Sequence, residues 1–131
     1  MKFMGLAHFT IPVTDLKRAQ AFYEGTLGMK VVQPERGGNG MVFLDAGGDC
    51  VILAHVEEPI STARVRDIHH AFKVPHEDYT KARAELESKG VKVLFEEDRQ
   101  GGAVNGPRFY FHDPDGNVLE IIDLTSYKGA A

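Results

Sequence analysis

The sequence predicts an α+β fold built from two consecutive βαβββ modules. Two observations support this prediction. Each half of the chain reads as one strand, one helix and then three strands. Equivalent residues also recur at a nearly fixed distance, because His69 follows His8 by 61 positions and Gly90 follows Gly28 by 62. A spacing that survives along both halves indicates an internal duplication.

The first module is predicted from its apolar pattern. Residues 6–13 alternate between apolar and polar side chains, which is typical of a half-buried strand. Thr14 or Asp15 is a suitable N-cap for the following helix, and Gly28 ends it. Glycine-rich turns then separate three short strands, expected at about 29–33, 40–44 and 50–54.

The second module repeats this plan. A strand is expected over 68–74, a helix over 76–89 and further strands near 92–96, 108–112 and 118–123. The glycine-rich segment 99–106 is the largest difference between the halves, and it reads either as a mobile lid or as a flexible connection.

The polar segment 57–62 reads as a linker between the two modules. We therefore expect a single domain over residues 1–131, with modules at about 1–56 and 67–127.

Composition excludes several classes of function. The net charge of −4 disfavours nucleic acid and anionic membranes as partners. The single cysteine excludes an internal disulfide and fits a reducing compartment. The N-terminus lacks the apolar region of a signal peptide, and no apolar run is long enough to span a bilayer. We expect a cytoplasmic protein whose partner is a small molecule.

The segment 108–123 is predicted to be a hairpin that carries the site. Strand alternation places Phe109 and Phe111 in the core and puts Arg108, Tyr110 and His112 on the other face. The second strand holds one acid, Glu120, within an apolar run. A buried carboxylate is costly unless it is paired, and a metal ion would pair with it. The alternative is an edge strand with Glu120 facing water.

Three candidate metal ligands share one orientation. His8, His69 and Glu120 each point to the side of a strand that faces away from the helices. The two histidines occupy equivalent positions in the two modules. Two imidazoles and one carboxylate form the facial triad that leaves positions open on a divalent ion, and such sites accept Mn, Fe, Co, Ni or Zn.

These residues resemble the vicinal oxygen chelate superfamily, which includes glyoxalase I, fosfomycin-resistance enzymes, extradiol dioxygenases and bleomycin-binding proteins. The resemblance spans nearly the whole chain. Its motifs are, in order, His8-Phe9-Thr10-Ile11-Pro12-Val13, Asp15-Leu16, Phe22-Tyr23, Leu27-Gly28, His69 with Phe72 and Val74, and Tyr110 with Asp113-Pro114-Asp115-Gly116 and Glu120.

The resemblance implies a fold, a metal and a set of roles. The two modules would form cupped, incomplete barrels, and the protein would be a homodimer. One divalent ion would be held by His8, His69 and Glu120, with ligands from one chain or from two. Tyr110 and Glu120 would be the catalytic residues.

We also predict three substrate-binding residues, of which Thr10 matches a substrate-contacting position of the fosfomycin-resistance enzymes. Thr10 and Arg108 would orient the substrate, and His112 would tune the site. Arg108 has an alternative interpretation as a surface residue beside the glycine-rich segment.

This chain lacks some functional residues of each of these families, and the differences exclude only some of the possible reactions. Ile52 stands opposite Glu120 in the repeat, so the fourth ligand of glyoxalase I is missing. Gly129 and Gln100 replace two cations of the fosfomycin-resistance enzymes. The run from Tyr110 to Glu120 matches extradiol dioxygenases, but two histidines of that family are absent. Bleomycin-binding proteins lack the metal ligands that this chain keeps.

We therefore predict a metal-dependent lyase, isomerase, or thiol or epoxide transferase acting on a small oxygen-rich substrate. The alternatives are an Fe(II) ring-cleaving dioxygenase and a metal-free binding protein of the bleomycin-resistance type.

Overall fold

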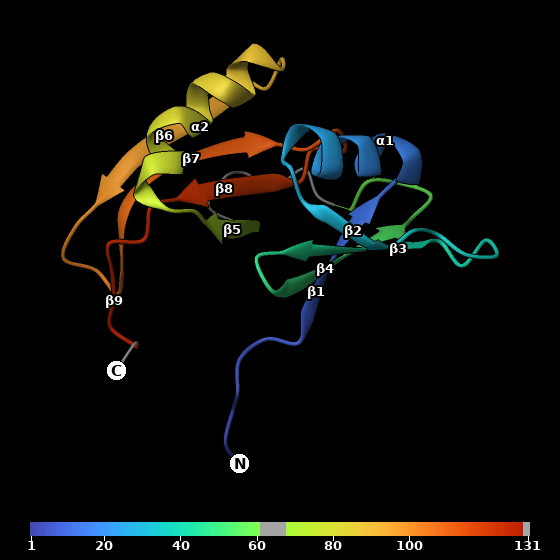
Figure 1. Cartoon of the computed structure of the whole chain (residues 1–131), viewed down its shortest axis with the longest axis horizontal. Helices are drawn as coiled ribbons and strands as arrows, with labels where there is room; N and C mark the ends of the chain where they lie inside the picture. The colour runs from blue at the N-terminus through green and yellow to red at the C-terminus, as the bar shows by residue number, and fades with distance from the viewer. Residues whose placement is uncertain (61–67, 130–131) are drawn as a thin grey trace. The chain divides into compact units, whose positions relative to one another are not determined.

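The computed structural model describes residues 1–60 and 68–129 and places one open β-sheet in each of two units, unit 1 (1–62) and unit 2 (63–131) (Figure 1). The end of the predicted linker and the predicted start of the second module, at 67, lie outside the described residues. None of the described helices is both long and apolar enough to cross a membrane.

Unit 1 has four strands in the order β1-β4-β3-β2. β1 runs parallel to β4, and the other two pairs are antiparallel. Its elements, in chain order, are β1 (His8–Val13), α1 (Leu16–Gln20), the π-helix η1 (Ala21–Thr26), β2 (Lys30–Gln33), β3 (Met41–Ala46) and β4 (Asp49–His55).

The helical segment of unit 1 begins and ends where the sequence predicts. The Asp15 side chain caps it by accepting a 3.0 Å hydrogen bond from the Arg18 amide. The second half widens into a π-helix, in which the Leu27 amide donates to the Phe22 carbonyl, five residues earlier. Gly28 follows with a φ of 81°, the left-handed conformation that commonly ends a helix.

The two faces of β1 differ as predicted. Ile11 and Val13 are fully buried, whereas His8 and Thr10, on the opposite side of the strand, are exposed. The apolar alternation of residues 6–13 therefore fixes which side chains of this strand remain accessible to a ligand.

Unit 2 repeats the layout in the order β5-β8-β7-β6, again with one parallel pair, β5 and β8. Its elements, in chain order, are β5 (His69–Lys73), α2 (His76–Ser88), β6 (Val93–Arg99), β7 (Val104–His112), β8 (Val118–Ile122) and β9 (Ser126–Tyr127). The two-residue strand β9 pairs with the start of β7 and was not predicted.

Strand register supports the duplication. In unit 1, Thr10 pairs with Ile52, and in unit 2, Ala71 pairs with Glu120. Thr10 and Ala71 each lie two positions after the equivalent histidine, so Ile52 occupies the position of Glu120, as the sequence predicts. The predicted α+β fold of two βαβββ modules with open sheets is confirmed.

The core of unit 2 lies on the helix side of its sheet. Phe109 and Phe111 are fully buried there, and the Tyr79 ring of α2 lies 5.7 Å from the Phe109 ring. Figure 1 shows α2 lying along this sheet. The opposite side chains of β7 are consequently left for the candidate site.

The prediction of an eight-residue loop over 99–106 is wrong. β6 continues to Arg99, which pairs with Gly106 of β7, so only residues 100–103 form the turn. The side chain of Asn105 holds this turn, because it accepts from the Gly102 amide at 2.7 Å and donates to the Gly102 carbonyl at 2.8 Å. The segment is thus a tight hairpin turn and not a long lid.

Gly106 has no space for a side chain. Its φ is 130°, and a Cβ atom would overlap the carbonyl oxygen of Asp123. We expect Gly106→Ala to lower the free energy of unfolding by about 2–4 kcal/mol, measured by urea denaturation. Gly102→Ala, at an ordinary φ with 3.4 Å to the nearest atoms, should cost less than about 1 kcal/mol. Equal losses in both variants would contradict this account.

Candidate metal site

Glu120 is a buried acid in the middle of a sheet. Its strand, β8, lies between β5 and β7, and the residue is only 2% exposed. The alternative of an edge strand with Glu120 facing water is therefore wrong. A carboxylate in this position requires partners that offset the loss of water.

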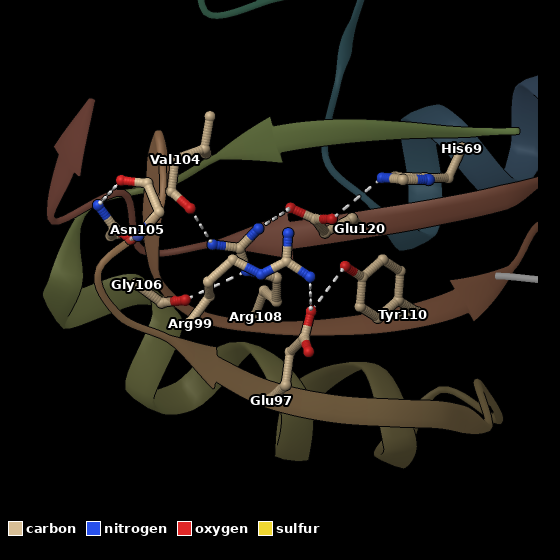
Figure 2. Close-up of polar contacts among 10 residues, drawn as sticks. His69, Glu97, Arg99, Val104, Asn105, Gly106, Arg108, Tyr110 and Glu120 are labelled. Carbon is tan, nitrogen blue, oxygen red and sulfur yellow. Dashed lines mark hydrogen bonds and ion pairs between the residues drawn. The ribbon is translucent and has the colours of Figure 1, made fainter. Parts of the chain in front are cut away.

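Two side chains supply those partners, as Figure 2 shows. The His69 Nε2 atom lies 3.4 Å from Glu120 Oε1, and the Arg108 Nη1 atom lies 3.9 Å from Glu120 Oε2. The His69 side chain is 33% exposed. The partly exposed imidazole thus lies beside one carboxylate oxygen, and the buried guanidinium lies beside the other and balances its charge.

Arg108 is an interior residue. It is 4% exposed, and its Nε and Nη2 atoms donate to the carbonyls of Gly106 and Val104 at 3.2 and 3.0 Å. The interpretation of Arg108 as a surface residue is wrong. These two carbonyl oxygens, which belong to the same hairpin, hold the guanidinium beside Glu120 (Figure 2).

Tyr110 provides a hydrogen-bond donor next to this pair. Its ring is 5% exposed and packs edge-on against the His69 ring, with centroids 5.5 Å apart. Burial, followed by the neighbouring carboxylates of Glu120 and Glu97, raises the pKa of Tyr110 well above its ordinary value. The hydroxyl therefore stays protonated at neutral pH.

Two residues of the site were missed. The Tyr110 hydroxyl donates to Glu97 Oε1 at 3.4 Å, and the same oxygen lies 3.3 Å from Arg99 Nη2. Sequence reasoning ended this strand at Glu96, so neither residue was assigned to the sheet. Continuing the alternation from Phe95 to Glu97 and Arg99 would have placed both on the face of Tyr110.

Other predicted site residues are located but remain predictions. His8 and Thr10 are exposed on β1 in unit 1. His112 is exposed at the end of β7, on the same face of the strand as Tyr110. His70 is half-buried on the other face of β5, where burial and the neighbouring His69 lower its pKa.

The donor set fits a divalent metal in part. Within unit 2, an imidazole nitrogen and a carboxylate oxygen converge, and both are common ligands of Mn, Fe, Co, Ni and Zn. In the part of the chain that the structure describes, no three His, Cys, Asp or Glu side chains are grouped closely enough to hold an ion. The predicted third ligand, His8, lies on β1 of unit 1.

Comparison with known proteins gives one family and several relatives. A family model described as the Glyoxalase/Bleomycin resistance protein/Dioxygenase superfamily matches residues 5–121. Glutathione transferase FosA of Serratia marcescens is 30% identical over 88% of this chain and 78% of that protein. Metallothiol transferase FosB of Lysinibacillus sphaericus is 30% identical over 92% and 83%. The mitochondrial methylmalonyl-CoA epimerase of Bos taurus is 30% identical over 87% and 70%.

Solved structures share the fold. The integron cassette protein HFX_CASS4, from the mobile metagenome of a Halifax Harbour sewage outfall, has a TM-score of 0.78 and is 26% identical over 93% of this chain and all of that chain. Fosfomycin resistance protein FosX of Listeria monocytogenes, complexed with Mn(II) and sulfate, has a TM-score of 0.74 and is 22% identical over 93% and 91%.

Removing the Arg108 guanidinium should show how much free energy is needed to keep the Glu120 carboxylate buried without a partner. We expect Arg108→Met to lower the free energy of unfolding by about 3–5 kcal/mol, because Glu120 loses its balancing charge. The double variant Arg108→Met, Glu120→Leu should recover most of this loss, since neither charge remains. Urea denaturation in metal-free buffer measures both.

The matched control for this prediction is Arg99→Met. The Arg99 side chain is 56% exposed, so its loss should cost at most about 1 kcal/mol. The explanation fails if Arg108→Met is no more destabilising than this control.

Proposed function

Because the chain belongs to the Glyoxalase/Bleomycin resistance protein/Dioxygenase superfamily, we propose that it is a divalent-metal-dependent enzyme acting on a small oxygen-rich substrate. The resemblance predicted from the sequence motifs is thereby confirmed at the level of the family. The relatives are named as transferases and an epimerase, which supports an enzyme. Two of the three are transferases, and they favour thiol or epoxide transfer over lyase, isomerase or ring-cleaving chemistry.

The observation that carries the proposal is the burial of Glu120 next to the partly exposed His69. A carboxylate placed in the middle of a sheet contributes little to stability, because its desolvation offsets what its partners return. Such a group is therefore a candidate for binding a ligand. Its nearest accessible neighbour is an imidazole, and this combination favours a metal ion as that ligand.

His8 is the proposed third ligand. It is exposed on β1 and occupies in the first module the position of His69 in the second. We further propose a homodimer in which His8 of one copy joins His69 and Glu120 of the other. The resemblance to this superfamily supports that assignment.

The chain's own residues have distinct roles in this proposal. A bound divalent ion would supply Lewis acidity toward substrate oxygens. Tyr110 keeps its proton at neutral pH and would donate it, or a hydrogen bond, to an oxygen that gains negative charge. Thr10 would orient the substrate through its exposed hydroxyl, and His112 would contact it at the end of β7. Arg108 was predicted to orient the substrate. Because it is buried and two carbonyls already hold its guanidinium beside the carboxylate, we propose that it positions Glu120.

Metal binding tests the proposal directly. Mn²⁺ is the first probe, because a FosX structure of the same fold contains Mn(II). We expect about one ion per chain by calorimetry and elemental analysis, and at least a hundredfold weaker binding in His8→Ala, His69→Ala and Glu120→Gln, because each loses one of three ligands. His55→Ala, an exposed histidine at the end of β4, is the matched control. A wild-type protein that takes up neither Mn²⁺, Fe²⁺, Zn²⁺, Ni²⁺ nor Co²⁺ would refute the proposal.

Mixing variants tests the sharing of ligands. If His8 comes from the partner copy, co-refolded His8→Ala and Glu120→Gln chains form hybrid dimers with one intact site. Hybrids that bind one ion per dimer support shared ligands, and hybrids that bind none place all three ligands in one chain.

The substrate class is tested by activity assays of the metal-loaded protein. The substrates are epoxides with glutathione, α-oxoaldehyde–thiol adducts, and catechols with oxygen uptake monitored.

A further inference from the structure

Tyr110 lies between two carboxylates on neighbouring strands. On one side, Tyr110 pairs with Glu120 of β8. On the other side it pairs with Phe95 of β6, and Glu97 lies two residues after Phe95 on the same face of that strand. The hydroxyl donates to Glu97 Oε1 at 3.4 Å, and Glu120 is near enough to contribute to the raised pKa of Tyr110. A phenol has one proton, so it can serve only one carboxylate at a time.

The choice between these acceptors matters for Glu120. Its two oxygens already face His69 and Arg108. A hydrogen bond donated by Tyr110 would occupy a further lone pair that a cation needs. Hydrogen bonds to an ionised carboxylate are among the stronger ones in proteins, so an incoming ion would have to displace a bond of substantial strength.

Glu97 is held in place to accept this bond instead. Its carboxylate lies between the Arg99 guanidinium and the Tyr110 hydroxyl (Figure 2). The preceding residue, Glu96, does not share this role, because it contacts Arg83 of α2 on the helix side of the sheet. Strand alternation therefore gives only one of the two adjacent glutamates to the site.

We propose that Glu97 is a positioning residue that draws the Tyr110 hydroxyl away from Glu120 and so leaves the Glu120 oxygens available to a divalent ion. This inference rests on the proposed metal site and assigns a role in it to a residue of β6. It also gives a role to a second carboxylate that contacts Tyr110 and Arg99.

Mn²⁺ affinity, measured by calorimetry at neutral pH, tests the role of Glu97. We expect Glu97→Val to bind Mn²⁺ about tenfold more weakly, because Tyr110 then donates to Glu120. Glu97→Gln keeps an acceptor oxygen and should bind within about threefold of the wild type. In a Tyr110→Phe background, Glu97→Val should not change the Mn²⁺ affinity further, because no hydroxyl remains to compete with the ion for Glu120.

These variants separate the inference from a simple charge effect. If Glu97 acted only by its negative charge, Glu97→Gln would bind as weakly as Glu97→Val, and the loss would persist in Tyr110→Phe. Either result overturns the inference, as does wild-type affinity in Glu97→Val. Glu96→Val is the matched control, because it removes an adjacent glutamate from the opposite face, and it should bind as the wild type does.

Folding and metal binding are checked independently. Valine is favoured in strands, and circular dichroism verifies each variant; Glu97→Thr takes its place if the valine variant does not fold. If the wild type binds no Mn²⁺, the proposed function itself fails for this ion and the inference fails with it. If the wild type binds Mn²⁺ and Glu97→Val binds equally well, only the inference fails.

Discussion

The burial of one carboxylate is the constraint on which unit 2 depends. Glu120 occupies the central strand β8, where its charge is removed from water. Arg108 balances that charge, and it can do so only because the carbonyls of Val104 and Gly106 hold its guanidinium in the interior. The close approach of Gly106 to Asp123 keeps this end of the hairpin in place. The result is a pre-formed pair, Glu120 and His69, that opens on the face away from α2.

The duplicated scaffold carries this polar set in only one unit. Tyr110 pairs with Glu120 across β7 and β8, whereas the corresponding pair across β3 and β4 is Phe43 with Ile52. Likewise, Arg108 pairs with Ile122, and Met41 pairs with Ala54 at the corresponding position. The two sheets therefore have the same topology but different chemistry. In the proposed site, His8 and Thr10 come from unit 1. The Glu120 carboxylate, the proton donor Tyr110 and the charged residues around them come from unit 2.

Period-two alternation and turn residues were sufficient to predict most of the fold. They identified both modules, a helix cap at Thr14 or Asp15, the accessible faces of His8 and His69, and the opposition of Ile52 and Glu120. Glycine content misled the prediction of residues 99–106, because it cannot distinguish a long loop from a hairpin turn flanked by strands. The contact of Glu97 with Tyr110 and the contact of Arg108 with Glu120 could not be predicted from the sequence. Both depend on strand register, which is set by pairing between distant segments.

The central claim is that His69 and Glu120 together hold a metal ion. Pulsed electron paramagnetic resonance of the Mn²⁺-loaded protein tests it most directly, because a coordinated imidazole gives a ¹⁴N coupling that water does not. The account predicts a nitrogen coupling in the wild type that is diminished in His69→Ala, measured at metal concentrations that still fill the site. A spectrum of Mn²⁺ without nitrogen coupling, or one that His69→Ala leaves unchanged, would contradict the account.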